Sequence, residues 1–363
     1  MSTELDDWHA RHGYVPRPRL DDYAQKYADY FVMTRRDGIL QLRMHTDGGP
    51  ARFDFATHNA WAQAWQEIGN DPENEVLILT GTGEEWLAPD PDPAAGATTL
   101  IQQTRLADFR YEHTYYDAIK LLENFVFGID IPTIAALNGP STSHTEFALL
   151  CDITLAAPTA TIVDPHLLAG VAPGDGQQLT LQHLVGTKRA AYHLYTGAPI
   201  TAPEALELGL VNEVVPADEL LSRAWEIAES IMARPRAARR LTHAITQRPW
   251  KRALVHDLGF GVAHEMFGAS PPTDSSDPLS TGGQPAPAAS GPQRRTFHPG
   301  SRTCCPLPCG KLLEADGSDA MAKSDPESEG PQRSSRDCHE IRRCGAASVP
   351  PGPESGPLPT HAR

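Results

Sequence analysis

Two apolar runs of strand length, each preceded by an amphipathic helical pattern, constrain the fold of this chain more than any other feature. Residues 75–81 and 132–139 are apolar at most positions and end in glycine, which is typical of strands buried on both faces of a parallel sheet. The segments before them, 58–68 and 109–127, carry apolar side chains at helical spacing. This alternation of helix and strand predicts an α/β fold with a mostly parallel sheet.

The remainder of the central region continues the alternation and then becomes helical. Two short strands are expected around the turn Arg36–Gly38, a helix at 146–150 and a strand at 152–156. Further helices are expected at 187–194, 203–209, 218–233 and 235–247, with a strand signal at 210–215.

Four aromatic and imidazole side chains on the predicted helices are assigned structural roles. Trp61 and Trp65 lie one turn apart on the helix at 58–68, a spacing that predicts core packing. His58 and His113 lie on amphipathic helices and are expected to be structural or exposed.

Composition divides the chain into four regions. They are a loosely ordered polar N-terminal arm (1–28), a strand-and-helix core (29–200), a C-terminal helical region (201–269) and a tail rich in proline, glycine, serine and arginine (270–363). The tail lacks a periodic apolar pattern and cannot bury enough apolar surface to offset its ordering entropy, so it is predicted to be disordered. A shifted reading frame produces the same kind of composition, and the sequence does not separate the two.

The charge of the chain excludes several classes of partner. The formal net charge is -15 and the isoelectric point is about 5.4, so binding to nucleic acid or to an anionic membrane surface is not expected. No run approaches the roughly 18 apolar residues of a membrane helix, and the N-terminus lacks the basic start and apolar core of a secretory signal. These observations favour a cytoplasmic enzyme.

Cysteine usage agrees with a reducing compartment. Cys151 is the only cysteine before residue 300, so the body of the chain has no disulfide framework. The tail cysteines occur as CC-x3-C and C-x5-C, which match no paired zinc-ligand spacing. No metal is therefore predicted.

Five strings in order identify the family that the chain resembles. They are LILTGTG (77–83), IPTIAALNGP (131–140), CDITLAA (151–157), GVAPGDG (170–176) and YTGAPITAPEALELGLVNEVV (195–215). Together they resemble the crotonase (enoyl-CoA hydratase/isomerase) superfamily over about 240 residues. The resemblance implies a core of ββα spiral turns, a C-terminal helical region, a small-molecule substrate and a homotrimer or a dimer of trimers.

The resemblance also implies an oxyanion hole made of two peptide N–H groups that stabilise an enolate oxygen. Matching the family's loops assigns one donor to Asp90, in the loop that begins at Trp86, and the other to Ser143. Both loops lack the glycines usual in the family, which indicates a remodelled site. Trp86 is assigned to the wall of the substrate pocket.

Two departures from the family pattern change the expected chemistry. The first of the two glutamates that hydratases use is present as Glu146, but the position of the second is His166. Asp175 lies nine residues beyond His166, and His144 lies two residues before Glu146. A neutral imidazole near a carboxylate can activate water, because the carboxylate orients the ring and stabilises the imidazolium.

This set of side chains resembles one branch of the superfamily, the β-diketone hydrolases typified by 6-oxocamphor hydrolase. The strings that carry the resemblance are residues 138–146, 170–176, 45–48 (His-Thr-Asp-Gly) and 263–265 (Ala-His-Glu). The branch implies a retro-Claisen cleavage that needs no cofactor. Water activated by His166 with Asp175 adds to one carbonyl, and His144 helps to stabilise the enolate. Phe53, where the branch carries tryptophan, and Glu265 are expected in the substrate pocket.

Three other readings remain open at this point. An acyl-CoA hydratase or isomerase could use Glu146. A non-catalytic binding or assembly subunit of the same fold would be marked by a basic stripe, which the acidic composition does not favour. A cyclase could use the same imidazole base without breaking a carbon–carbon bond.

Overall fold

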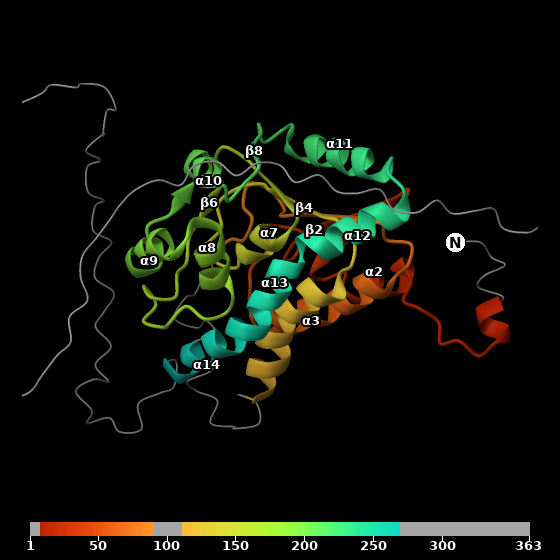
Figure 1. The fold of residues 1–363 in the computed structure, drawn as a ribbon, viewed down its shortest axis with the longest axis horizontal. Helices are drawn as coiled ribbons and strands as arrows, with labels where there is room; N and C mark the ends of the chain where they lie inside the picture. The colour runs from red at the N-terminus through yellow and green to blue at the C-terminus, as the bar shows by residue number, and fades with distance from the viewer. Residues whose placement is uncertain (1–7, 90–110, 269–363) are drawn as a thin grey trace, which may run out of the picture. The chain divides into compact units, whose positions relative to one another are not determined.

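The computed structural model describes residues 8–89 and 111–268 (Figure 1). The predicted disordered tail (270–363) and the predicted donor Asp90 lie outside the described residues. Within the described residues, no helix combines the length and the apolar character that crossing a membrane requires.

A six-stranded sheet forms the centre of the fold and confirms the predicted α/β architecture. The strand order is β1-β2-β3-β4-β5-β8, in which β1 pairs antiparallel with β2 and all other neighbours are parallel. The bounds are β1 (Phe31–Arg36), β2 (Ile39–Met44), β3 (Val76–Thr80), β4 (Thr133–Leu137), β5 (Ile153–Ala156) and β8 (Glu213–Val214). A second, antiparallel sheet of β6 (Thr161–Ile162) and β7 (Ile200–Thr201) was not predicted, because two-residue strands carry no periodic signal.

The hairpin between β1 and β2 follows from its turn residues. Arg36 pairs with Ile39, so the loop consists of Asp37 and Gly38 alone. Both have positive φ, 50° and 84°, as a two-residue hairpin turn requires, and Asp-Gly adopts this conformation at low cost.

Helices cover both faces of the sheet. Their bounds are α2 (Leu20–Lys26), α3 (Phe55–Asn70), η1 (His113–Ile119), α6 (Lys120–Glu123), η2 (Asn124–Gly128), α7 (Glu146–Leu150), α8 (Gln177–Val185), α9 (Thr187–Thr196), α10 (Ala202–Leu208), α11 (Leu220–Met232), α12 (Arg236–Thr246), α13 (Arg248–Ala253), η3 (Leu254–Leu258) and α14 (Gly259–Gly268). The predicted long helix at 109–127 corresponds, in its described part, to η1, α6 and η2, which include π-helical turns.

Strand β3 explains why the apolar runs predicted a two-sided sheet. Leu77 and Leu79 belong to the core that contains Trp61 and Trp65 of α3. The alternate side chains, including Ile78, pack into a second core with Ala224 and Ala228 of α11, which lies across the sheet from α3 in Figure 1. Every side chain of the strand is buried except for a small part of Thr80.

Part of the predicted N-terminal arm is ordered into the core. Helix α2 lies inside residues 1–28, and Tyr23 and Tyr27 are buried. The Tyr23 hydroxyl donates to Asp71 at 2.9 Å. The prediction of a loosely ordered arm is therefore wrong for residues 20–28, because these two aromatic rings pack against the core.

Candidate active site

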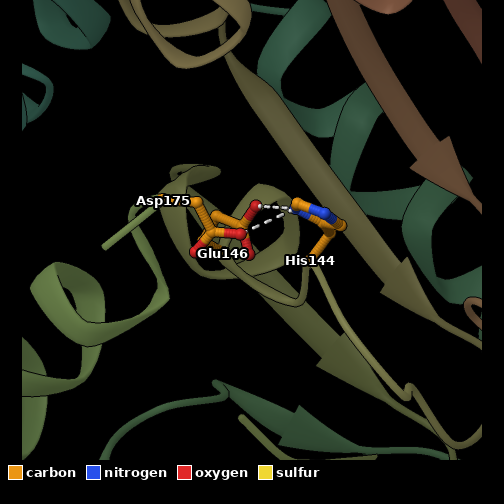
Figure 2. A group of neighbouring side chains, drawn as sticks. All are labelled: His144, Glu146 and Asp175. Carbon is orange, nitrogen blue, oxygen red and sulfur yellow. Dashed lines mark hydrogen bonds and ion pairs between the residues drawn. The ribbon is translucent and has the colours of Figure 1, made fainter. Parts of the chain in front are cut away.

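Five of the predicted site residues come from four segments that the fold brings together. His144 lies just before α7 and Glu146 is the first residue of that helix. His166 follows β6, Asp175 lies in the turn before α8, and Glu265 is on α14. Figure 2 shows the imidazole of His144 facing the carboxylates of both Glu146 and Asp175.

The Asn-Gly pair after β4 holds the loops at the end of the sheet. The Asn138 amide accepts a hydrogen bond from the Gly81 N–H at 3.1 Å and donates to the Gly83 and Glu85 carbonyls at 2.9 Å each. A Cβ on Gly139 would lie 1.7 Å from the Glu84 carbonyl oxygen, so only glycine allows this approach.

A second close backbone contact places α14 against the site. A Cβ on Gly174 would lie 2.2 Å from the carbonyl oxygen of Gly261. Because neither residue has a side chain, the turn that carries Asp175 packs directly on α14. Glu265, four residues beyond Gly261 on the same helix, thereby lies with Oε1 3.7 Å from Nε2 of His166.

His144 adopts a left-handed backbone conformation, with φ of 50°, which costs free energy for a residue with a side chain. Its Nδ1 lies 2.7 Å from Glu146 Oε1, and its ring packs on Phe53 with centroids 3.9 Å apart. The Trp86 indole N–H donates to the His144 carbonyl at 3.5 Å. Trp86 is fully buried, so its place is beneath the His144 loop, whereas Phe53 is next to the imidazole itself.

His166 is held by a carboxylate that the sequence analysis did not assign. Oδ1 of Asp164 accepts the His166 backbone N–H at 3.0 Å and lies 2.9 Å from Nδ1. Nε2 of the same ring lies 3.4 Å from Oδ2 of Asp175. Asp164 is therefore a second carboxylate beside His166, at the nitrogen that does not face Asp175. The Asp-x-His spacing, which suits an Asp side chain bonding backbone two residues on, was the available signal.

Asp175 connects the two imidazoles. Its Oδ2 lies 3.6 Å from Nδ1 of His144 and 3.4 Å from Nε2 of His166. Burial favours the neutral carboxyl, yet the positive charges of His166 and His144 hold the pKa of Asp175 well below its usual range. Asp175 is thus the anion that both histidines share.

The histidines and the remaining carboxyls shift one another's protonation. Burial opposes a charge on either imidazole, but Asp175 and Asp164 raise the pKa of His166 well above its usual range, and Glu146 raises that of His144. Burial and the charge of Asp175 raise the pKa of Glu265 to about 8. Burial likewise raises the pKa of Glu146, which is fully buried. The site therefore favours the imidazolium form of both histidines and, at neutral pH, a neutral Glu265 carboxyl.

The predicted oxyanion donor Ser143 lies in the loop before His144. Its carbonyl accepts the Ser141 hydroxyl at 2.6 Å, and no described group accepts its N–H. Gln177, another residue that the sequence analysis missed, joins the two histidine loops. Its side chain accepts the Thr145 N–H at 3.1 Å and donates to the Val163 carbonyl at 3.2 Å.

Two groups of side chains have the composition of a cation site. Ligand atoms of His144, Glu146 and Asp175, and those of His166, Asp175 and Glu265, lie within 4.8 Å of one another in each group. Both groups share Asp175, and their imidazoles already pair with the carboxylates. These pairs suit proton transfer, and the expectation that the site needs no metal stays a prediction.

Comparison with known proteins places the chain among relatives of two activities. Residues 34–276 match the family model described as enoyl-CoA hydratase/isomerase. A crotonyl-CoA hydratase from Syntrophomonas wolfei is 35% identical over 203 residues, which are 55% of this chain and 74% of that protein. A solved structure of a β-diketone hydrolase from the cyanobacterium Anabaena, bound to (S)-3-oxocyclohexyl acetic acid, is 35% identical with a TM-score of 0.63, over 70% of this chain and 98% of that one. An enoyl-CoA hydratase/isomerase from Mycobacterium paratuberculosis is 24% identical with a TM-score of 0.58, over 66% of this chain and 94% of that one, which shows the fold alone.

Proposed function

The chain belongs to the enoyl-CoA hydratase/isomerase family, and we propose that within this family it hydrolyses a carbon–carbon bond of a 1,3-diketone. One observation carries the proposal: Asp164 holds Nδ1 of His166, so that Nε2 faces Asp175 and Glu265. Such an imidazole can take a proton from water, because the carboxylate at its other nitrogen stabilises the imidazolium that forms. The 35% identity to the Anabaena β-diketone hydrolase supports the same activity.

In the first step, Nε2 of His166 accepts a proton from water while the water oxygen adds to one carbonyl carbon of the diketone. Asp164 fixes the ring and Asp175 places negative charge beside Nε2. The Glu265 carboxyl, with a pKa of about 8, is mostly protonated at neutral pH. It can therefore donate a hydrogen bond to a substrate oxygen.

In the second step, the adduct breaks its bond to the carbon that lay between the two carbonyls, and the electron pair of that bond forms an enolate. Protonated His144 and the Ser143 N–H stabilise the negative charge, and His144 then transfers its proton to the enolate carbon. The products are a ketone and a carboxylic acid, joined in one keto acid when the diketone is cyclic. No cofactor is consumed, and ionisation of the acid releases one proton per turnover.

Hydration or isomerisation of an enoyl-CoA thioester is the second candidate activity. It is favoured by the crotonyl-CoA hydratase relative and by the presence of Glu146 at the site. However, Glu146 is fully buried and its Oε1 is paired with His144 at 2.7 Å. In addition, His166 occupies the position at which hydratases carry their second glutamate. The observed pairing of His144 with Glu146, and the histidine at position 166, therefore fit the diketone reaction better than the hydration of a thioester.

Incubation of the full-length protein with a panel of cyclic 1,3-diketones and a panel of enoyl-CoA thioesters tests the choice. We expect a keto acid from at least one diketone, detected by mass spectrometry, with one oxygen from ¹⁸O-labelled water in the new carboxyl group. Turnover of the thioesters alone would overturn the proposal and favour the second candidate. The oligomeric state predicted by the family resemblance, a trimer or a dimer of trimers, is measured on the same preparation by light scattering.

The pH dependence of kcat/KM is expected to be a narrow bell. The base form of His166 appears only above its raised pKa, so the rate should rise through a value well above 6.5. The acid form of Glu265 is lost as the pH rises through its pKa of about 8, so the rate should fall there.

Glu265→Gln tests the assignment of the falling limb, because it keeps a neutral hydrogen-bond donor at every pH. This variant should therefore lose the falling limb and keep the rising limb, because Glu265 is already mostly neutral at the pH where the rising limb lies. A wild-type profile that is flat from pH 6 to pH 9 would contradict this assignment.

A further inference from the structure

Beyond the groups used in the proposed reaction, a third imidazole touches the site. His58, in the first turn of α3, packs edge-to-face on His144, with ring centroids 5.1 Å apart and an interplanar angle of 84°. Its Nδ1 lies 2.6 Å from the Asp54 carbonyl oxygen. Because a carbonyl only accepts, Nδ1 carries the hydrogen and Nε2 is the basic atom of the ring.

From His58 a chain of contacts leads to the surface. The ring of His113, which is buried, lies 5.5 Å from that of His58 at 68°, and its Nδ1 lies 3.4 Å from Oδ2 of Asp117. Asp117 also accepts a hydrogen bond from Asn59 at 2.9 Å. It borders a surface groove of about 550 Å³ that Lys120 also lines. The chain of side chains therefore runs from His144 to a surface that water reaches.

The charges around His58 keep it neutral. Burial and the neighbouring imidazoles of His144 and His113 hold the pKa of His58 well below its usual range, although the Asp54 carbonyl and the charge of Asp175 oppose this shift. Nε2 is therefore unprotonated between turnovers and can accept a proton. Any proton that it accepts is passed on quickly, since the imidazolium is disfavoured there.

We propose that His58, His113 and Asp117 form a path that carries the surplus proton of each turnover from His144 to the surface. This inference rests on the proposed function and follows from its proton balance. His166 gains one proton from water, the acid product loses one, and His144 gives one to carbon. One of the two protons gained restores His144, for which Asp175 lies between the histidines. The other is accepted by Nε2 of His58, released from the same atom toward His113 and Asp117, and lost to water at the surface, so no further reactant is needed.

Substitution of His58 tests the path in turnover. His58→Phe fills the same space without a basic atom, and we expect kcat to fall by at least about 10-fold with KM unchanged. His58→Ala should show the same fall, and added imidazole should restore its rate in a saturable manner. Pyrazole, a ring of the same size and much weaker basicity, should not restore the rate. Restoration by both rings would indicate that His58 only fills space and would overturn the proposal, as would an unchanged kcat in His58→Phe.

An exposed histidine offers a matched control. Nδ1 of His12 lies 2.7 Å from the carbonyl oxygen four residues before it, as Nδ1 of His58 does. His12→Ala should keep wild-type kcat and should not respond to imidazole.

A measurement without substrate separates the failure of the path from the failure of the proposed function. In the ¹⁵N spectrum of histidine-labelled full-length protein, the resonances lost in His58→Phe should be those of a neutral ring protonated at Nδ1. The Nε2 resonance should move as His144 titrates. A charged His58 at pH 7, or one protonated at Nε2, would overturn the path even if diketones are cleaved. The expected spectrum in a protein that cleaves no diketone would instead refute the proposed function, and the proton path with it, while the neutral state of His58 would stand.

Discussion

His166→Ala should lower kcat for diketone hydrolysis by at least about 100-fold, since removal of a general base usually costs about two to four orders of magnitude. The reason is the geometry of one ring. Asp164 occupies Nδ1 at 2.9 Å, and Nε2 faces Asp175 at 3.4 Å. No other described imidazole lies between Asp164 and Asp175 in this way, so no neighbour replaces the lost base. Steady-state kinetics on the best diketone of the panel measure the effect.

Two further variants make this result specific. His193→Ala removes a partly buried histidine of α9 whose Nδ1 lies 2.9 Å from the Ala198 carbonyl oxygen, and it should leave kcat unchanged. Asp164→Asn should give an intermediate loss, because the amide can still hold the backbone N–H of His166 but cannot stabilise the imidazolium. A loss of less than about 10-fold in a folded His166→Ala protein would mean that His166 is not the base.

Asp152→Ala should lower the free energy of unfolding by about 3–5 kcal/mol, the usual cost of leaving a buried charge without its partner. The Asp152 carboxylate accepts hydrogen bonds from the Thr133 N–H at 2.9 Å and from the Thr246 hydroxyl at 2.6 Å. Nδ1 of buried His243 lies 2.7 Å from the same carboxylate, and its Nε2 lies 3.0 Å from the Ile129 carbonyl oxygen. Both nitrogens face acceptors, so removal of the carboxylate leaves Nδ1 of this buried ring without its partner.

Urea unfolding of the wild type and the variant measures this difference. Burial opposes the charge on Asp152, but His243 lowers the pKa of the carboxyl. The pair therefore stabilises the protein above the unfolded carboxyl pKa, and the contribution is lost as pH falls through the lower folded value. Asp257→Ala, at an exposed helical acid, should change the free energy of unfolding by no more than about 0.5 kcal/mol. Equal effects of the two substitutions would contradict the buried pair.

The network at Asp152 shows where prediction from sequence reaches its limit. The string CDITLAA placed Asp152 at the start of a strand, and β5 begins at the next residue. Its partners His243 and Thr246 lie 91 and 94 residues further along the chain. Periodicity predicted the helix that carries them, α12. It contains no information on which residue of a distant strand that helix contacts.

The candidate site, too, was predicted from the sequence only in part. Counting along the family's motifs singled out His144, Glu146, His166 and Asp175, and the structure brings these four together with Glu265. Asp175 was predicted as the partner of His166, but Asp164, only two residues before it in the chain, was not singled out as a second one. His58 was expected to be structural or exposed, since a helical position does not reveal that His144 lies across from it.

The sequence by itself determined the alternation of strands and helices, the two-sided burial of the central strands, and the family. These follow from patterns within about 20 consecutive residues or from strings matched in order. Only the tertiary structure decided which nitrogen of His166 is occupied, that α14 reaches the site, and that a second pair of histidines lies beside it. Such facts depend on approaches as close as that of Gly174 to Gly261. Backbone packing between segments far apart in the chain sets them, and no local pattern records that packing.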